Sequence, residues 1–260
     1  DREARPEPAC PRRSRSPLMG RHALVVGGTR GIGAAVSRAL AASGRDLVVT
    51  FASDEESATR IGEDIRRSSG RTVHTLRADV ADLASVGLIE EFLAKDDISL
   101  DAVVIVAGVT SRQAFGSIQT DDWNAVLTAN VTFPVMLLQA IADRIQAGGA
   151  VVLTGSSMGI HPHSVSLAYG VTKAAVHALA GNLVKVFAPR GIRVNAIAPG
   201  FVETDWHATK TEEHRRSIEG KIALGRFADP DEIAAAYLMA VDNPYLNGAV
   251  IPIDGGYSYR

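Results

Sequence analysis

The sequence predicts a doubly wound α/β fold, with a seven-stranded parallel sheet and helices on both of its faces in a single domain. From residue 23 onward, short apolar runs alternate with segments of helical periodicity, which is typical of repeated βαβ units. Several of these runs are apolar throughout, as expected for strands that helices cover on both sides. A length of 260 residues with 46% hydrophobic residues suits one large domain with a substantial core.

Short apolar runs rich in β-branched residues define the strands. In chain order we expect them at 23–27, 46–51, 72–76, 102–106, 150–154, 193–197 and 249–253. The helical patterns between them predict helices at 31–43, 55–68, 82–95, 121–146, 167–187 and 230–241. Right-handed crossovers would distribute these helices over the two faces of the sheet.

Two segments interrupt the alternation, at 110–120 and 201–226. The second follows Pro199-Gly200, contains Trp206 and carries a helical patch at 212–219. Long irregular segments in compact domains are often active-site lids, so we predict a mobile lid over a ligand. The alternative is an ordinary surface insertion.

Composition argues against several classes of partner. The 27 basic and 29 acidic side chains give a net charge of −2, which does not favour nucleic acid or an anionic membrane. Cys10 is the only cysteine, so neither a disulfide framework nor a cysteine-based metal site is expected. This cysteine content is typical of a protein in the reducing cytoplasm, which is the predicted location. No apolar run approaches the roughly 18 residues of a membrane span. Residues 1–18, with four prolines and five arginines, are predicted to be a disordered extension.

A glycine-rich turn links the first strand to the first helix, with the sequence Gly27-Gly28-Thr29-Arg30-Gly31-Ile32-Gly33. Gly27 permits a tight turn, Gly31 lets the backbone approach a pyrophosphate, and Gly33 lets helix and strand pack closely. The helix N-terminus then offers N–H groups to the anion. The turn predicts a dinucleotide site, although its spacing is GxxxGxG rather than GxGxxG.

The end of the second strand favours NADP(H) over NAD(H). It lacks the acidic residue that would accept a hydrogen bond from the ribose 2′-hydroxyl, since Asp54 comes later and is expected to be a helix-terminal carboxylate. Arg30 is placed to engage a 2′-phosphate, with a hydrogen bond from Ser53. The alternative is that Arg30 is merely solvated. After the third strand, Asp79 and Val80 are candidates to hold the adenine edge.

Three polar residues are expected to converge at the carboxyl end of the fifth strand. Tyr169 and Lys173 are one helical turn apart, so they project from the same helix face. A cation beside the phenol favours the phenolate, which makes the tyrosine a proton carrier. Ser156 follows the predicted strand at 150–154, where open α/β sheets bind their ligands. A Tyr–Lys pair alone can also be an ordinary exposed pair on a helix.

The glycine turn, Asn130, Ser156, the Tyr169–Lys173 pair and Pro199-Gly200 occur in an order that resembles the short-chain dehydrogenase/reductase family over nearly all of residues 20–260. The chain is most similar to 3-oxoacyl-[acyl-carrier-protein] reductases and related ketoreductases. The resemblance implies a Rossmann fold with Tyr169 as general acid, Ser156 as hydrogen-bond donor to the substrate carbonyl and Lys173 as ribose ligand. Asn130 would anchor a water that relays protons to Lys173.

Further cofactor contacts follow from the same resemblance. They comprise residues of the glycine turn, the segment after the fourth strand and the segment after the sixth, namely Thr29, Ile32, Ala107, Gly108, Pro199, Gly200, Val202 and Thr204. The resemblance also implies a homotetramer. If the ketone is carrier-bound, an acidic acyl carrier protein is the candidate partner, with Arg190 and Arg193 as candidate docking cations near the site.

Two positions depart from the family pattern. Val26 replaces a threonine and Ile105-Val106 replaces an Asn-Asn pair, which in the family are joined by a polar contact between adjacent strands. Replacing both partners by apolar groups can be nearly neutral, whereas replacing one would leave a buried polar atom unpaired. We predict that the two changes are a matched exchange of a hydrogen bond for packing.

The predicted function is NADPH-dependent reduction of a ketone, either a 3-oxoacyl thioester or a similar small-molecule ketone, to a secondary alcohol. One alternative is an alcohol, sugar or steroid dehydrogenase of the same family. Another is a non-catalytic NADP(H)-binding sensor that kept the fold. His161 and His163 lie between Ser156 and Tyr169, but two histidines without a third ligand do not predict a metal site.

Overall fold

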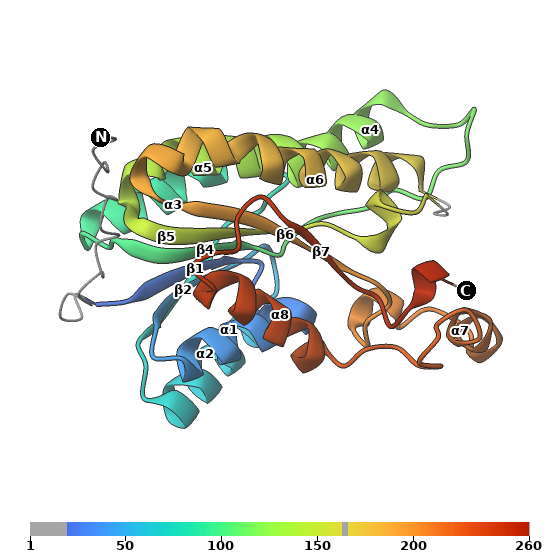
Figure 1. Ribbon diagram of the computed structural model, residues 1–260, viewed down its shortest axis with the longest axis horizontal. Coiled ribbons are helices and arrows are strands. Elements are labelled where there is room, and N and C mark those ends of the chain that lie inside the picture. Colours follow the sequence, from blue (N-terminus) through green and yellow to red (C-terminus); the bar gives the residue numbers. More distant parts are fainter. Residues whose placement is uncertain (1–19, 163–165, 260) are drawn as a thin grey trace, which may run out of the picture.

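A parallel sheet forms the centre of the molecule (Figure 1). The computed structural model describes residues 20–162 and 166–259, so the predicted disordered extension at 1–18 lies outside the described residues. Within them, seven strands follow the order β3-β2-β1-β4-β5-β6-β7 and all pair in parallel, which confirms the predicted doubly wound sheet. The strands are β1 His22–Val26, β2 Asp46–Phe51, β3 Val73–Arg77, β4 Leu100–Ile105, β5 Ile145–Thr154, β6 Arg193–Pro199 and β7 Val250–Ile253.

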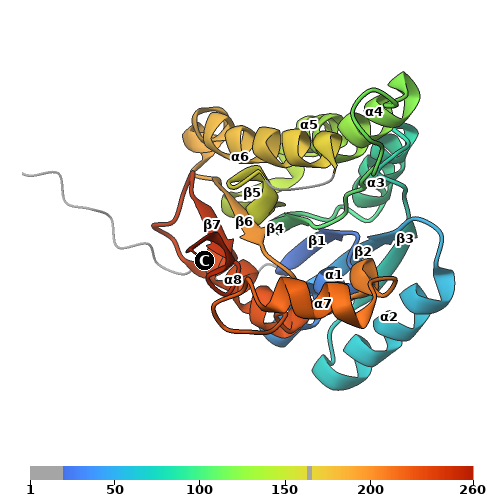
Figure 2. The same ribbon diagram turned by 90° about the vertical axis from the view of Figure 1, so that its right-hand side faces the viewer.

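Helices cover both faces of the sheet (Figures 1 and 2). One layer holds α1 Gly31–Ala42, α2 Glu55–Ser69 and α8 Pro230–Asp242, and the other holds α3 Ala84–Lys95, α4 Thr120–Leu127, α5 Phe133–Ala140 and α6 Leu167–Phe187. Successive side chains of a strand point to opposite faces of the sheet. Leu24 belongs to the core under α5 and α6, whereas Ala23 and Val25 belong to the core under α1 and α8. This alternation explains why the strand sequences are apolar throughout.

The predicted helix at 121–146 is wrong in its continuity and its end. It divides into α4 and α5, and between them a π-helical turn spans Thr128–Thr132. Pro134 has no N–H to donate to the carbonyl of Asn130, so regular α-helical bonding cannot continue through this turn. The backbone N–H of Phe133 instead reaches back five residues to the carbonyl of Thr128.

The predicted strand at 150–154 is too short, because β5 begins at Ile145, where it pairs with Leu100. Gly148 and Gly149 are accommodated inside the strand. Gly148 adopts a φ of 80°, and the register against β4 shifts at this point, as in a β-bulge. A Cβ on Gly149 would lie 2.9 Å from the carbonyl oxygen of Gln146, so a side chain does not fit there.

The lid segment contains α7 Glu212–Glu219, which confirms the predicted helical patch (Figure 2). Ile218, Ile222 and Phe227 form a small buried cluster that is separate from the two main cores. Phe201 packs against this cluster, with ring centroids 5.4 Å apart for Phe201 and Phe227. The segment therefore folds around its own apolar centre.

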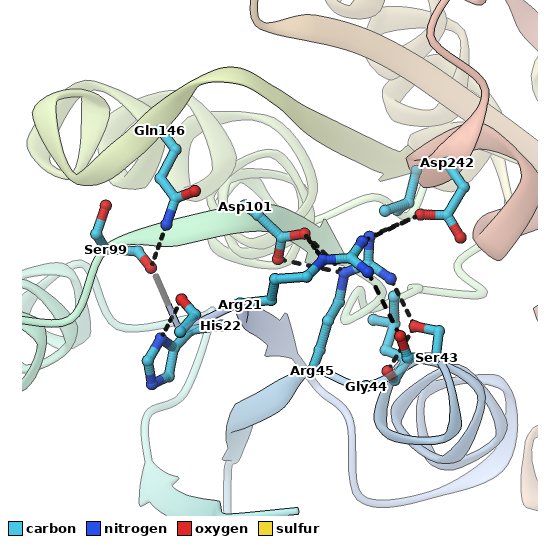
Figure 3. A network of polar contacts seen from close by, with 12 residues as sticks. Arg21, His22, Ser43, Gly44, Arg45, Ser99, Asp101, Gln146 and Asp242 are labelled. Atoms are coloured by element: carbon cyan, nitrogen blue, oxygen red, sulfur yellow. Dashed lines mark hydrogen bonds and ion pairs between the residues drawn. The ribbon is translucent and has the colours of Figure 1, made fainter. Parts of the chain in front are cut away.

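A polar cluster closes the amino ends of the strands (Figure 3). Arg45, which is 1% exposed, donates to Asp101 at 3.0 Å and to Asp242 at 2.7 Å. Arg21 donates to the same Asp101 carboxylate at 3.0 Å. These ion pairs link the starts of β1, β2 and β4 to the end of α8, and they keep the buried guanidinium paired.

The prediction that Arg190 and Arg193 lie near the site is wrong. Both belong to the amino end of β6, opposite the carboxyl ends where ligands bind. Arg193 is 9% exposed and donates to the Ala240 carbonyl at 2.8 Å, while Arg190 donates to the carbonyls of Ala142 and Ile145. Both guanidinium groups are therefore engaged with backbone carbonyls at this end of the sheet.

Candidate active site

A cavity of about 440 Å³ opens at the carboxyl ends of the strands, between the glycine turn and the segment 201–207, part of the predicted lid. It brings together Ser156, Tyr169 and Lys173 in one wall. Nearly all of the predicted cofactor contacts also line it: Gly27, Thr29, Arg30, Gly31, Ile32, Gly33, Asp79, Val80, Ala107, Gly108, Pro199, Gly200, Val202 and Thr204. Of the predicted residues, Ser53 and Asn130 are not part of the lining.

The glycine turn is shaped for close approach of a ligand to the backbone. Gly27 has a φ of 77°, and a Cβ there would lie 2.7 Å from the Cβ of Ala107. A Cβ on Gly33 would lie 2.0 Å from the Gly27 carbonyl oxygen. Among the described residues no side chain caps the start of α1, and its first turn carries no acidic residue. The N-terminal N–H groups therefore face the cavity as an anion site, which fits the pyrophosphate of a dinucleotide.

Basic side chains lie in and beside the cavity near the ends of β2 and β3. Arg30 is 59% exposed and approaches Asp54 to 3.7 Å. Asp54 caps α2 by accepting from the Ser57 N–H at 2.9 Å, which confirms its expected helix-terminal role, and this hydrogen bond is the main cause that lowers the pKa of Asp54. Arg77, at the end of β3, donates to the Ala52 carbonyl at 3.1 Å beside the cavity. The sequence reasoning missed Arg77, although it is the last residue of a strand, next in the sheet to β2.

Ser156 and Tyr169 lie together in the wall of the cavity. The Ser156 Oγ accepts from the backbone N–H of Met158 at 3.2 Å, which leaves its own hydrogen free to donate. It forms a hydrogen bond with the Tyr169 hydroxyl. Burial raises the pKa of Tyr169, and the bond to Ser156 opposes this only in part. Lys173 does not contribute to this shift, so the lowering expected from its charge is not found, and the phenol stays protonated at neutral pH, as a general acid requires.

Lys173 is 3% exposed and lies beneath the tyrosine. Its Nζ is 5.5 Å from the Tyr169 ring centroid and donates to the Thr154 carbonyl at 2.6 Å. Burial lowers the pKa of Lys173 to about 8. The ammonium is held at the carboxyl end of β5, within the wall of the cavity.

Asn130 lies behind the cavity wall in the π-helical turn. Its side chain accepts from the Val109 N–H at 2.8 Å and donates to the Val109 carbonyl at 2.9 Å. A Cβ on Gly108 would lie 2.9 Å from the Asn130 Oδ1 and 3.4 Å from the Lys173 Nζ. Because Gly108 has no side chain, both polar groups can approach the segment that follows β4. The π-helical turn orients the Asn130 side chain toward this segment.

Val26 and Ile105 are direct neighbours in the paired strands β1 and β4, and both are buried. Nearby, the Thr154 hydroxyl donates to the Ile105 carbonyl at 2.7 Å and forms a 2.6 Å hydrogen bond with the Tyr237 hydroxyl. Apolar contact thus replaces the family's polar one, while a Thr–Tyr pair satisfies polar groups one strand away. The matched exchange remains a prediction.

Three residues near the centre escaped the sequence reasoning or were left open by it. His177 contacts the loop after β5, and the Lys173 spacing extended by four residues would have identified it. Trp206 lies 5.9 Å from Tyr169 between ring centroids, in the lid. His207 lines the cavity, and its Nδ1 is buried without a hydrogen-bond partner among the described residues.

The described residues contain neither a candidate metal-binding cluster nor a candidate membrane-spanning helix. No cluster of three potential metal ligands occurs in residues 20–162 and 166–259, and His163 lies outside these described residues. In the same part of the chain, none of the helices has the length and hydropathy needed to span a bilayer.

Comparisons with known proteins agree with this geometry. Residues 26–258 match a family described as enoyl-(acyl carrier protein) reductase. The 3-oxoacyl-[acyl-carrier-protein] reductase FabG of Aquifex aeolicus is 32% identical over 243 residues, covering 92% of this chain and 98% of that protein.

Solved structures of short-chain dehydrogenases/reductases are similar to this chain in fold. A short-chain dehydrogenase/reductase from Serratia marcescens and a short-chain dehydrogenase from Burkholderia cenocepacia in complex with NADP each superpose with a TM-score of 0.86. Each is 30% identical to this chain, and the alignment covers 94% of it and 100% of the other chain. The chain therefore belongs to the short-chain dehydrogenase/reductase family of oxidoreductases.

Proposed function

We propose that the protein reduces a ketone to a secondary alcohol with NADPH. The observation that carries this proposal is the convergence of Ser156, Tyr169 and Lys173 on a cavity that also contains the glycine turn. A hydride acceptor, a proton donor and a dinucleotide can meet only where these parts share one space.

The roles of the side chains follow from charge development on the substrate oxygen. When bound, the nicotinamide supplies the hydride. Ser156 donates a hydrogen bond to the ketone oxygen, and Tyr169 stabilises the developing charge before it transfers its proton. Lys173 binds the ribose, and Asn130 anchors the water through which Lys173 exchanges protons with solvent. The reverse reaction, alcohol oxidation, would use the same groups.

The preference for NADP(H) rests on the cations at the adenosine end. Arg30 lines the cavity and is exposed enough to turn toward a 2′-phosphate, and Arg77 lies at the neighbouring strand end. Ser53 follows β2 and adds a hydroxyl. Because Asp54 is held at the start of α2, its carboxylate is committed to the helix rather than to a ribose hydroxyl.

The proposed substrate is a 3-oxoacyl thioester or a related ketone. The FabG relative supports this class. If an acyl carrier protein delivers the substrate, Arg190 and Arg193 cannot dock it, because they lie at the opposite end of the sheet. Arg112 and Lys210 are better placed, because the charges of both reach His207, which lines the cavity, and lower its pKa. Lys210 follows the cavity-lining residues Trp206 and His207.

A homotetramer is proposed on the same family grounds. The exposed side chains of α6 include Leu167, Val171 and Val186, which a single chain leaves in water. Mass determination in solution by light scattering checks this proposal, and a monomer at micromolar concentration would contradict it.

The decisive experiment is a panel of carbonyl compounds assayed with NADPH and NADH side by side. We expect turnover of 3-oxoacyl thioesters with NADPH. Turnover confined to small alcohols, sugars or steroids would favour the alternative dehydrogenase. NADPH binding without turnover anywhere in the panel would favour a sensor.

A further inference from the structure

His177 contacts the catalytic loop from the helix that carries Tyr169 and Lys173. It lies one helical turn beyond Lys173 on α6, so its ring projects from the same face. Its Nε2 accepts a hydrogen bond from the backbone N–H of Ser156 at 3.2 Å. Because Nε2 is the acceptor, the neutral ring carries its proton on Nδ1.

The loop is built to receive this ring. A Cβ on Gly155 would lie 2.0 Å from the His177 Nε2, and a Cβ on Gly159 would lie 2.8 Å from its Cε1. Both positions must be glycine for the imidazole to fit between them. The close fit places the acceptor beside the backbone N–H of Ser156.

The remaining bonds of the loop do not hold the Ser156 N–H. The Gly155 N–H donates to the Ile197 carbonyl at 2.7 Å, and the Ser156 carbonyl accepts from the Gly159 N–H at 2.9 Å. The Ser156 Oγ accepts from the Met158 N–H. His177 thus supplies the contact that ties the serine's own peptide to α6. Burial, aided by the charge of Lys173, lowers the pKa of His177 to about 4, so the ring remains an acceptor at neutral pH.

We propose that His177 is a positioning residue, which fixes the peptide of Ser156 so that its hydroxyl faces Tyr169 and the substrate oxygen. Displacement of a catalytic hydrogen-bond donor by about 1 Å costs up to roughly 100-fold in rate. The effect of His177 is therefore expected to pass through Ser156. This inference rests on the proposed ketone reduction, but it also has a test that does not depend on turnover.

The test compares two unbranched replacements of similar length. His177→Gln keeps an acceptor, the side-chain carbonyl, whereas His177→Met fills the gap without one. We expect His177→Met to lower kcat by about 10- to 100-fold with little change in KM, consistent with a loss at the transition state. His177→Gln should recover most of kcat. His177→Leu serves as a second variant without an acceptor should His177→Met fail to fold.

A double-mutant cycle separates positioning from general damage. In a Ser156→Ala background, His177→Met should lower kcat by no more than about twofold, because the group that it positions is already absent. Equal losses in both backgrounds would overturn the proposal. So would an unchanged kcat in His177→Met, or equal kcat values for His177→Met and His177→Gln.

Amide hydrogen exchange of Ser156, followed by NMR, gives a readout without substrate. We expect faster exchange, by about tenfold or more, in His177→Met, and near wild-type exchange in His177→Gln. Wild-type exchange in His177→Met would overturn the proposal. If the wild-type protein turns over none of the carbonyls, the proposed function fails, and this exchange measurement alone decides whether His177 holds Ser156.

Discussion

Replacing Lys173 by methionine is expected to make the protein more stable at pH 7. The lysine is buried, and burial lowers its pKa from 10.5 to about 8. The folded protein must therefore hold an ammonium in a site that favours the neutral amine. Methionine has a similar length and carries no charge.

The magnitude follows from the pKa difference. Lowering the pKa of Lys173 from 10.5 to about 8 destabilises the folded protein by about 3 kcal/mol at pH 7, since a tenfold change in an equilibrium constant is worth about 1.4 kcal/mol. Losing the hydrogen bond to the Thr154 carbonyl offsets about 1 kcal/mol of this. We expect a net gain of about 2 kcal/mol in the free energy of unfolding.

The pH dependence has a defined sign. Below pH 8 lysine is charged in both the folded and unfolded states, so the full cost is present. Between pH 8 and 10.5 the unfolded chain holds more protons than the folded one, so the wild-type protein recovers stability relative to the variant as pH rises. The advantage of Lys173→Met should largely disappear by pH 10.

Urea unfolding followed by circular dichroism at pH 7 and pH 10 measures both quantities. Lys185→Met, on the exposed side of the same helix, is the matched control and should change stability by less than about 0.5 kcal/mol. A Lys173→Met variant that is less stable than wild type at pH 7 would refute the reasoning, as would a gain that is the same at both pH values.

Four further changes test other parts of the structure. Tyr169→Phe should lower kcat at least about 100-fold while the Kd for NADPH stays within about twofold, as measured by steady-state kinetics and calorimetry, because only the proton donor is lost. Arg30→Ala should weaken NADPH binding about 10-fold and leave NADH binding nearly unchanged; an equal effect on both cofactors would exclude a 2′-phosphate contact. Asp101→Asn should cost about 3 kcal/mol in urea unfolding, because Arg45 loses a buried ion-pair partner; a change below about 1 kcal/mol would contradict this role. Val26→Thr should destabilise by about 1–3 kcal/mol, because its hydroxyl would face apolar neighbours; a clear gain in stability would count against the matched exchange.

The parts of the fold that depend on local pattern could be predicted from the sequence. The seven strands, the helical patch at 212–219 and the glycine turn all appear where apolar runs, helical spacing and glycines indicate them. Ser156, Tyr169 and Lys173 could be placed together because a strand end and one helical turn determine their positions.

The features that the sequence did not reveal depend on distant partners. The helix at 121–146 reads as continuous, but Asn130 bonds to Val109 on another element, and the chain adopts a π-turn to make that contact. The directions of Arg190 and Arg193 depend on backbone carbonyls that lie far from them in the sequence, such as those of Ala142 and Ala240. Pro134 is a local signal for the break in the helix, but no local spacing encodes the contact of Asn130 with Val109 or the directions of the two arginines.

The four-residue spacing of Tyr169 and Lys173 on α6 continues to His177. Tyr169, Lys173 and His177 occupy three successive turns of α6, and each delivers a polar group to the segment from Thr154 to Ser156: the phenol to the serine hydroxyl, the ammonium to the threonine carbonyl, and the imidazole to the serine N–H. A shift of α6 against β5 would break all three contacts together. The proposed proton donor, ribose ligand and carbonyl-binding hydroxyl are therefore all held by the contact between α6 and the end of β5. Because Gly155 and Gly159 have no side chains, the helix approaches this segment closely enough to form these contacts.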